Sequence, residues 1–214
     1  MKGFVELDKK LPFSAVLLAG GESKRMGVRK ALLKLGGDTF IDVIHRKLDG
    51  LFAETIVVTD IPQEFAYLGG IVTTDIIQEG EKNAMRGIHA GLSAASNHAC
   101  FVTGCDMPFF SLSLIEYMAQ FALDYDAVVP LKDGYYEPLF SFYHKNKLDF
   151  IEQRLIDHRY KLIDLYRHFN LKTIEGPIVR DFDPLLLSFA NINSPEDYQK
   201  LLDYWEKERS GSVN

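Results

Sequence analysis

The stretch SAVLLAGG, residues 14–21, decides the fold. Its apolar run, residues 14–18, predicts a buried strand, and the two glycines that follow predict a loop at the carboxyl end of that strand. Glycine lets the backbone approach a ligand closely, and successive N–H groups in such a loop can form a concavity that binds an anion. The loop therefore favours a ligand with negatively charged groups.

The same loop continues as ESKRMGVRK, residues 22–30, and carries four cations within seven residues: Lys24, Arg25, Arg29 and Lys30. Arginine suits forked binding of phosphate oxygens, and lysine acts on them as a point charge. A glycine turn with a solvated basic edge is the alternative. The preceding strand and the density of charge favour a phosphate site.

Outside this loop, short apolar runs typical of strands alternate with segments whose apolar residues recur at helical spacing. We expect strands at residues 14–18, 55–59, 71–74, 100–103 and 126–130, and helices at 39–52, 84–96, 113–123 and 195–208. The segment Ser113-Leu114-Ile115-Glu116 fits a capping box. Alternating strands and helices predict an α/β fold of three layers, with a Rossmann-like, mostly parallel sheet.

The second half of the chain is less regular. Residues 134–140 suggest a turn and one antiparallel segment, and helical patterns follow at about 147–168. Ser194 and Pro195 have the pattern of a helix cap followed by a first helical residue. We expect residues 1–214 to form a single domain, with a core from about 13 to 208. The loops after Leu18, Thr74 and Thr103 leave the carboxyl ends of strands, so they should converge on one crevice.

A second motif, GCDMP at residues 104–108, follows the strand predicted at residues 100–103. A carboxylate at a strand end is placed to hold Mg²⁺, which proteins bind through few carboxylates together with substrate phosphates. Asp106 could instead cap a turn, but the nearby glycine loop supplies the phosphates that such a metal needs. Cys100 and Cys105 are expected to be structural, because an unpaired cysteine is usually a small buried hydrophobic residue.

Composition excludes several classes of protein. The chain of 214 residues has a formal net charge of −6 and a pI near 5.5, which argues against a nucleic-acid partner. It has neither an apolar run long enough to span a membrane nor a secretory leader pattern, so we expect a cytoplasmic protein. Walker, GxGxxG, HExxH and CxxC motifs do not occur in the sequence.

These motifs together resemble the molybdenum cofactor guanylyltransferases, nucleotidyltransferases with a glycosyltransferase-A-like fold similar to that of the nucleotide-diphospho-sugar transferases. The family pattern LAGGxSxRMGxxK is matched by residues 18–30, and the metal-binding GCDMP by residues 104–108. The turn around the base is matched by residues 87–91. Residues 137–139 (EPL) and 191–197 (NINSPED) also fit. The likeness covers about residues 13–205.

The resemblance implies transfer of GMP from GTP to molybdenum-molybdopterin, with Mg²⁺ as cofactor. It implies three catalytic residues: Arg25, Lys30 and Asp106, the last of which would bind the metal. It also implies a set of nucleotide-binding residues: Leu18, Ala19, Gly20, Gly21, Lys30, Asp75, Gly87, Gly91 and Asp106. Asn191 and Asn193 would lie toward the pterin. Other cofactor-biosynthesis proteins and recipient molybdoenzymes are further expected partners.

The sequence departs from the family pattern at several positions. Arg29 replaces an aspartate, Ile88 replaces a proline, and the connection from residue 75 to 87 is lengthened. The asparagine that usually follows the second strand is replaced by Thr59 or Asp60. Two alternatives stay open: another nucleotidyltransferase on this scaffold, such as a molybdopterin cytidylyltransferase, or a non-catalytic nucleotide-binding regulatory module. The Leu-Ala-Gly-Gly sequence favours GTP, because the related cytidylyltransferases tend to have Ala-Ala-Gly there.

Overall fold

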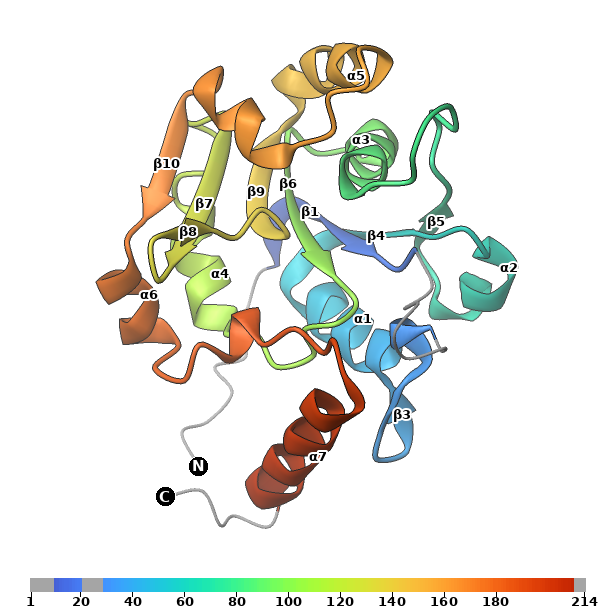
Figure 1. The fold of residues 1–214 in the computed structure, drawn as a ribbon, viewed down its shortest axis with the longest axis vertical. Helices are drawn as coiled ribbons and strands as arrows, with labels where there is room; N and C mark the ends of the chain where they lie inside the picture. Colours follow the sequence, from blue (N-terminus) through green and yellow to red (C-terminus); the bar gives the residue numbers. More distant parts are fainter. Residues whose placement is uncertain (1–9, 21–28, 210–214) are drawn as a thin grey trace.

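A mixed sheet of eight strands forms the centre of the molecule (Figure 1). The computed structural model describes residues 10–20 and 29–209. The main path of the sheet runs in the order β10-β7-β9-β6-β1-β4-β5, and β8 pairs with β7. The strands are β1 (Leu11–Leu18), β4 (Phe52–Val58), β5 (Ile71–Thr73), β6 (Ala99–Gly104), β7 (Ala127–Lys132), β8 (Tyr135–Tyr136), β9 (Phe140–His144) and β10 (Leu171–Ile174).

Four of the seven strand pairs in this sheet are parallel, which agrees with the predicted mostly parallel sheet. β1 pairs in parallel with β4 and β6, β4 with β5, and β7 with β10. β9 is antiparallel to both of its neighbours, β6 and β7. This places the antiparallel segment where the turn at residues 134–140 indicated it. The predicted fold class is therefore confirmed.

Helices cover both faces of the sheet and make three layers. Side chains of β1 alternate: Ala15 and Leu17 join one core, while Val16 faces the other. The first core is covered by α1 (Phe40–Leu51), α4 (Leu112–Ala119) and α6 (Gly176–Phe182). The second is covered by α3 (Ala84–Ala94) and α5 (Leu148–Ile156). A short helix, α2 (Pro62–Phe65), follows β4.

The helix boundaries follow local capping. Thr39 forms a capping box with Asp42 at the start of α1. The capping box predicted at Ser113 is wrong, because the N-cap of α4 is Ser111, whose side chain accepts the backbone N–H of Leu114. The pattern predicted over 147–168 is divided between α5 and a 3-10 helix at Leu162–Arg167. β10 and α6 were not predicted.

The last helix, α7 (Pro195–Arg209), packs beside a small hairpin formed by β2 (Lys34–Leu35) and β3 (Asp38–Thr39). Ser194 and Asp197 cap its first turn reciprocally, as the sequence indicated. The Trp205 ring lies over Gly36, where a β-carbon would be 2.2 Å from it and where φ is +67°. None of the helices in the described part of the chain has the length and apolarity needed to cross a membrane.

Candidate functional site

The carboxyl ends of four parallel strands, β1, β4, β5 and β6, open onto one cavity of about 1350 Å³. The loops after Leu18, Thr74 and Thr103 all contribute to its wall, so the predicted convergence is confirmed. Predicted site residues among those that line the cavity are Leu18, Gly20, Lys30, Asp75, Gly87, Asp106 and Asn193. Gly21 and Arg25 lie outside the described residues.

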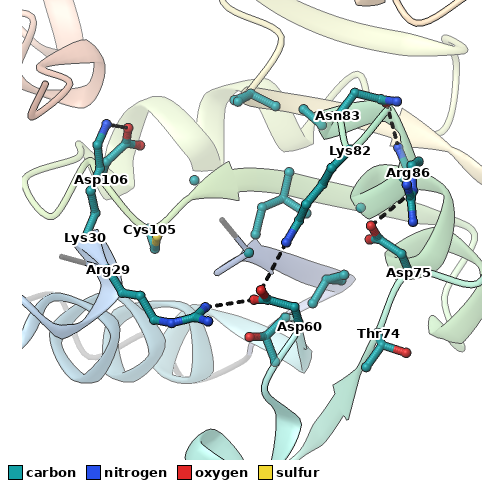
Figure 2. Close-up of a pocket in the computed structure, with 18 of the residues that line it drawn as sticks. Arg29, Lys30, Asp60, Thr74, Asp75, Lys82, Asn83, Arg86, Cys105 and Asp106 are labelled. Carbon is teal, nitrogen blue, oxygen red and sulfur yellow. Dashed lines mark hydrogen bonds and ion pairs between the residues drawn. The ribbon is translucent and has the colours of Figure 1, made fainter. Parts of the chain in front are cut away.

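Lys30 and Asp106 meet at one end of the cavity (Figure 2). The Lys30 Nζ lies 2.9 Å from the Asp106 Oδ2 and donates a second hydrogen bond of 2.9 Å to the Asn193 Oδ1. A β-carbon on Gly104 would be 2.8 Å from the Asp106 Oδ1, so glycine at that position makes room for the carboxylate. Asp106 and Asn193 are 76 and 163 positions away from Lys30 in the sequence, and the fold brings all three side chains into one cluster.

Asp60 binds two cations in the middle of the cavity wall. Its Oδ1 accepts a hydrogen bond of 2.9 Å from Arg29, and its Oδ2 lies 3.2 Å from the Nζ of Lys82 (Figure 2). Partial burial works to raise the pKa of Asp60, but the hydrogen bonds from Arg29 and Lys82 prevail and lower it to about 2. The carboxylate is therefore charged at neutral pH.

Asp75 lies at the far end of the cavity beside Arg86 of α3 (Figure 2). The Arg86 Nε is 3.2 Å from the Asp75 Oδ2, although its N–H makes no hydrogen bond. Burial raises the pKa of the Asp75 carboxyl, and the positive charge of Arg86 opposes that rise. Asn83 caps α3 by accepting the backbone N–H of Arg86, which fixes where this arginine enters the site.

Cys105 also lines the cavity but is a poor nucleophile. Burial, and then the negative charge of Asp106, raise the pKa of its thiol to about 12. The thiolate that nucleophilic catalysis requires is therefore scarce at neutral pH. This agrees with the structural role expected for Cys105.

Three residues of the predicted set do not line the cavity: Ala19, Gly91 and Asn191. Ala19 is buried at the end of β1. Gly91 faces the sheet, where an added β-carbon would be 2.3 Å from the Val16 Cγ1. Asn191 is exposed, and its neighbour Ile192 donates its backbone N–H to the Asp106 carbonyl at 3.4 Å.

Sequence reasoning missed the roles of Asp60, Lys82 and Arg86. Each had a local signal: Asp60 directly follows a β-branched strand, and the two cations lie between Asp75 and Gly87, Lys82 in the loop and Arg86 in the first turn of α3. The ion pairs that these residues form could not be predicted, because the paired residues are distant in the sequence. The structure shows that Arg29 and Lys82, which are distant in the sequence, meet at Asp60.

Comparison with known proteins agrees with this geometry. The model of the MobA-like NTP transferase domain matches residues 15–170, which include all four strand ends that form the cavity. The chain belongs to the MobA-like NTP transferase family. A probable molybdenum cofactor guanylyltransferase from Natranaerobius thermophilus is 36% identical over 91% of this chain and 97% of its own length.

One solved structure supports the same assignment, and a more distant one shares the fold. The molybdopterin-guanine dinucleotide biosynthesis protein A of Archaeoglobus fulgidus is 26% identical, with a TM-score of 0.79 over 91% of this chain and all of its own. A CMP:2-keto-3-deoxy-manno-octonic acid synthetase complexed with CTP, at 15% identity and a TM-score of 0.68, shares the fold. This MobA-like chain is thus a nucleotidyltransferase of the molybdenum cofactor guanylyltransferase group.

Proposed function

We propose that this protein transfers GMP from GTP to molybdenum-molybdopterin, forming the guanine dinucleotide cofactor and releasing pyrophosphate. The observation that carries the proposal is the contact of Lys30 with both Asp106 and Asn193 at the end of the cavity. A cation for phosphate, a carboxylate for a metal and an amide thus meet where two anionic substrates must be joined. The similarity to guanylyltransferases over nearly the whole chain supports the substrates.

In this reaction an oxygen of the terminal phosphate of molybdopterin attacks the α-phosphorus of GTP. A new P–O bond forms, the bond from the α-phosphorus to the oxygen bridging it to the β-phosphate breaks, and pyrophosphate leaves with the electron pair. The protein need not act as a nucleophile, which agrees with the high pKa of Cys105. Its contribution is to position the substrates and to stabilise charge.

The nucleotide would occupy the cavity from Asp75 to Lys30. Leu18 and Gly87 would surround the base and ribose, and Gly20, at the start of the glycine loop, would let the phosphate groups approach the backbone closely. Asp75 would contact the nucleoside, and Lys30 would bind phosphate oxygens. Arg25 is proposed to join Lys30 at the phosphates.

The residues present fit a bound Mg²⁺. Asp106 already holds one cation, the Lys30 ammonium, at 2.9 Å. No group of three acidic, histidine or cysteine side chains in the described part of the chain could hold a metal by itself. This matches Mg²⁺, which uses one or two carboxylates and takes its other ligands from phosphates and water. When bound, the ion would neutralise phosphate charge; Lys30 would then have phosphate oxygens as alternative partners.

The pterin would approach from the side of Asn193, which lines the cavity. Asn191 is exposed two residues away, on the same segment before α7, and would meet the pterin or its phosphate from outside. Cofactor-biosynthesis proteins and recipient molybdoenzymes are proposed as protein partners.

The test is product analysis with purified protein, Mg²⁺, molybdenum-loaded molybdopterin and either GTP or CTP. We expect pyrophosphate and the guanine dinucleotide with GTP only. Selective use of CTP would support the proposed reaction but contradict the assignment of guanine as the base. Binding of GTP without transfer to the pterin would indicate another acceptor or a regulatory module.

A further inference from the structure

We propose that Lys82 is a further nucleotide-binding residue, which contacts the phosphate groups of the nucleoside triphosphate, and that Asp60 holds Lys82 while the cavity is empty. This inference rests on the proposed function for the nature of the ligand. It concerns a lysine in the lengthened connection between β5 and α3, outside the motifs that identify the family.

The first observation is the position of the Lys82 side chain. It extends from its loop across the cavity toward Asp60 (Figure 2). Its Cε and Nζ are each 3.7 Å from the point where a β-carbon on Gly20 would lie. The ammonium thus lies over the beginning of the glycine loop, where the nucleotide is expected to bind.

The second observation is the exposure of the four cations that line the described part of the cavity. The Lys82 side chain is 47% exposed, compared with 22% for Arg29, 18% for Lys30 and 8% for Arg86. Lys82 is therefore the least enclosed of the four. An ion pair this exposed contributes little to folding and exchanges its partner readily.

The third observation is the balance of charge around Asp60. One carboxylate faces two cations, Arg29 at 2.9 Å and Lys82 at 3.2 Å. A triphosphate brings several negative charges and strong acceptor oxygens. Lys82 can leave Asp60 for a phosphate without leaving the carboxylate unpaired, because Arg29 stays bound to it.

The test compares the affinity of the wild type and Lys82→Gln for GTP, GDP, GMP and guanosine by calorimetric titration. Lys200→Gln is the matched control, because it removes one positive charge from an exposed position on α7. We expect Lys82→Gln to weaken GTP binding about tenfold, the worth of one charged hydrogen bond, and to leave guanosine unchanged. The control should leave both unchanged.

Two results would overturn the assignment of Lys82 to the phosphates. One is an affinity for GTP that does not change in Lys82→Gln. The other is an affinity for guanosine that falls as much as the affinity for GTP, which would indicate that Lys82 contacts the base or ribose. If the wild type binds CTP instead, the same series is measured with cytosine nucleotides. The assignment of guanine as the base then fails, but the role of Lys82 at the phosphates is still tested. The titrations contain no pterin, so they measure this role even if GMP transfer to the pterin is not observed.

Asp60→Asn tests the holding role separately. The Asp60 carboxylate competes with phosphate for Lys82. Removing the charge of Asp60 should therefore raise the affinity for GTP and leave the affinity for guanosine unchanged. Unchanged or weaker GTP binding would contradict this role. The melting temperature of each variant serves as the check that it is folded.

Discussion

Gly91 shows how a residue within a recognisable motif can serve packing. It lies in α3 where the helix meets β1, and an added β-carbon would be 2.3 Å from the Val16 Cγ1 and 2.8 Å from its Cγ2. Val16 is fully buried, so it has little room to move. The glycine therefore sets the distance between α3 and the sheet that carries the glycine loop.

Gly91→Ala is expected to lower the free energy of unfolding by about 2 kcal/mol, the usual cost of overpacking a filled core. Gly50→Ala is the matched control: Gly50 also lies in a helix, α1, with no atom within 4 Å of the added carbon. Because alanine has a higher helix propensity than glycine, Gly50→Ala should leave the free energy of unfolding equal or higher. Urea unfolding measures both. Equal stability of the two variants, with GTP binding lost only in Gly91→Ala, would place Gly91 at the nucleotide instead.

At the scale of the element, α4 depends on Ser111. Its hydroxyl oxygen accepts the Leu114 backbone N–H at 3.2 Å, and its O–H donates to the Phe182 carbonyl at 3.0 Å, which joins α4 to α6. We expect Ser111→Ala to cost about 1 kcal/mol of unfolding free energy. Ser113→Ala, at an exposed position in the first turn, should cost less than about 0.5 kcal/mol. Chemical denaturation that ranks the two in the opposite order would restore the cap predicted from the sequence.

The segment from β5 to α3 depends on the pair formed by Asp75 and Arg86. Burial raises the pKa of the Asp75 carboxyl, Arg86 and Lys82 lower it, and Asp60 raises it. Arg86→Gln should raise it further, so the folded state holds a proton that the unfolded state has lost. Stability of the variant therefore falls as pH rises through the window above the ordinary carboxyl pKa.

We expect Arg86→Gln to lose about 3 kcal/mol of unfolding free energy at about pH 8 and clearly less at about pH 5. Arg86→Lys, which keeps the charge, should recover part of the loss at the higher pH. Denaturant titrations at both pH values measure this. The same loss at both would mean that Arg86 acts through packing alone.

At the scale of the whole molecule, the sequence predicted the parallel strands and the convergence of their loops, because apolar runs and glycines are local signals. β10 and α6 were missed because LKTI, at residues 171–174, is a short strand without strict alternation and Gly176-Pro177 reads as a turn. The ion pairs of Asp60 were missed because Arg29 and Lys82 reach it only through space. Periodicity predicts elements, whereas these contacts depend on how the elements pack.

The whole molecule brings opposite charges together along one cavity: Lys30 with Asp106, Arg29 and Lys82 with Asp60, and Arg86 with Asp75. Such pairing keeps cations in place before a polyanionic substrate arrives. GMP transfer is expected at the end of the cavity where Lys30 meets Asp106.

The most direct test is the rate of pyrophosphate release from GTP in the presence of Mg²⁺ and molybdenum-loaded molybdopterin, measured for the wild type and Asp106→Asn. The substitution keeps the shape of the side chain and the space beside Gly104 while removing the charge. We predict a loss of at least about 100-fold in rate with an unchanged melting temperature. A variant that releases pyrophosphate at the wild-type rate would contradict the assignment of Asp106, and with it the proposed site of transfer.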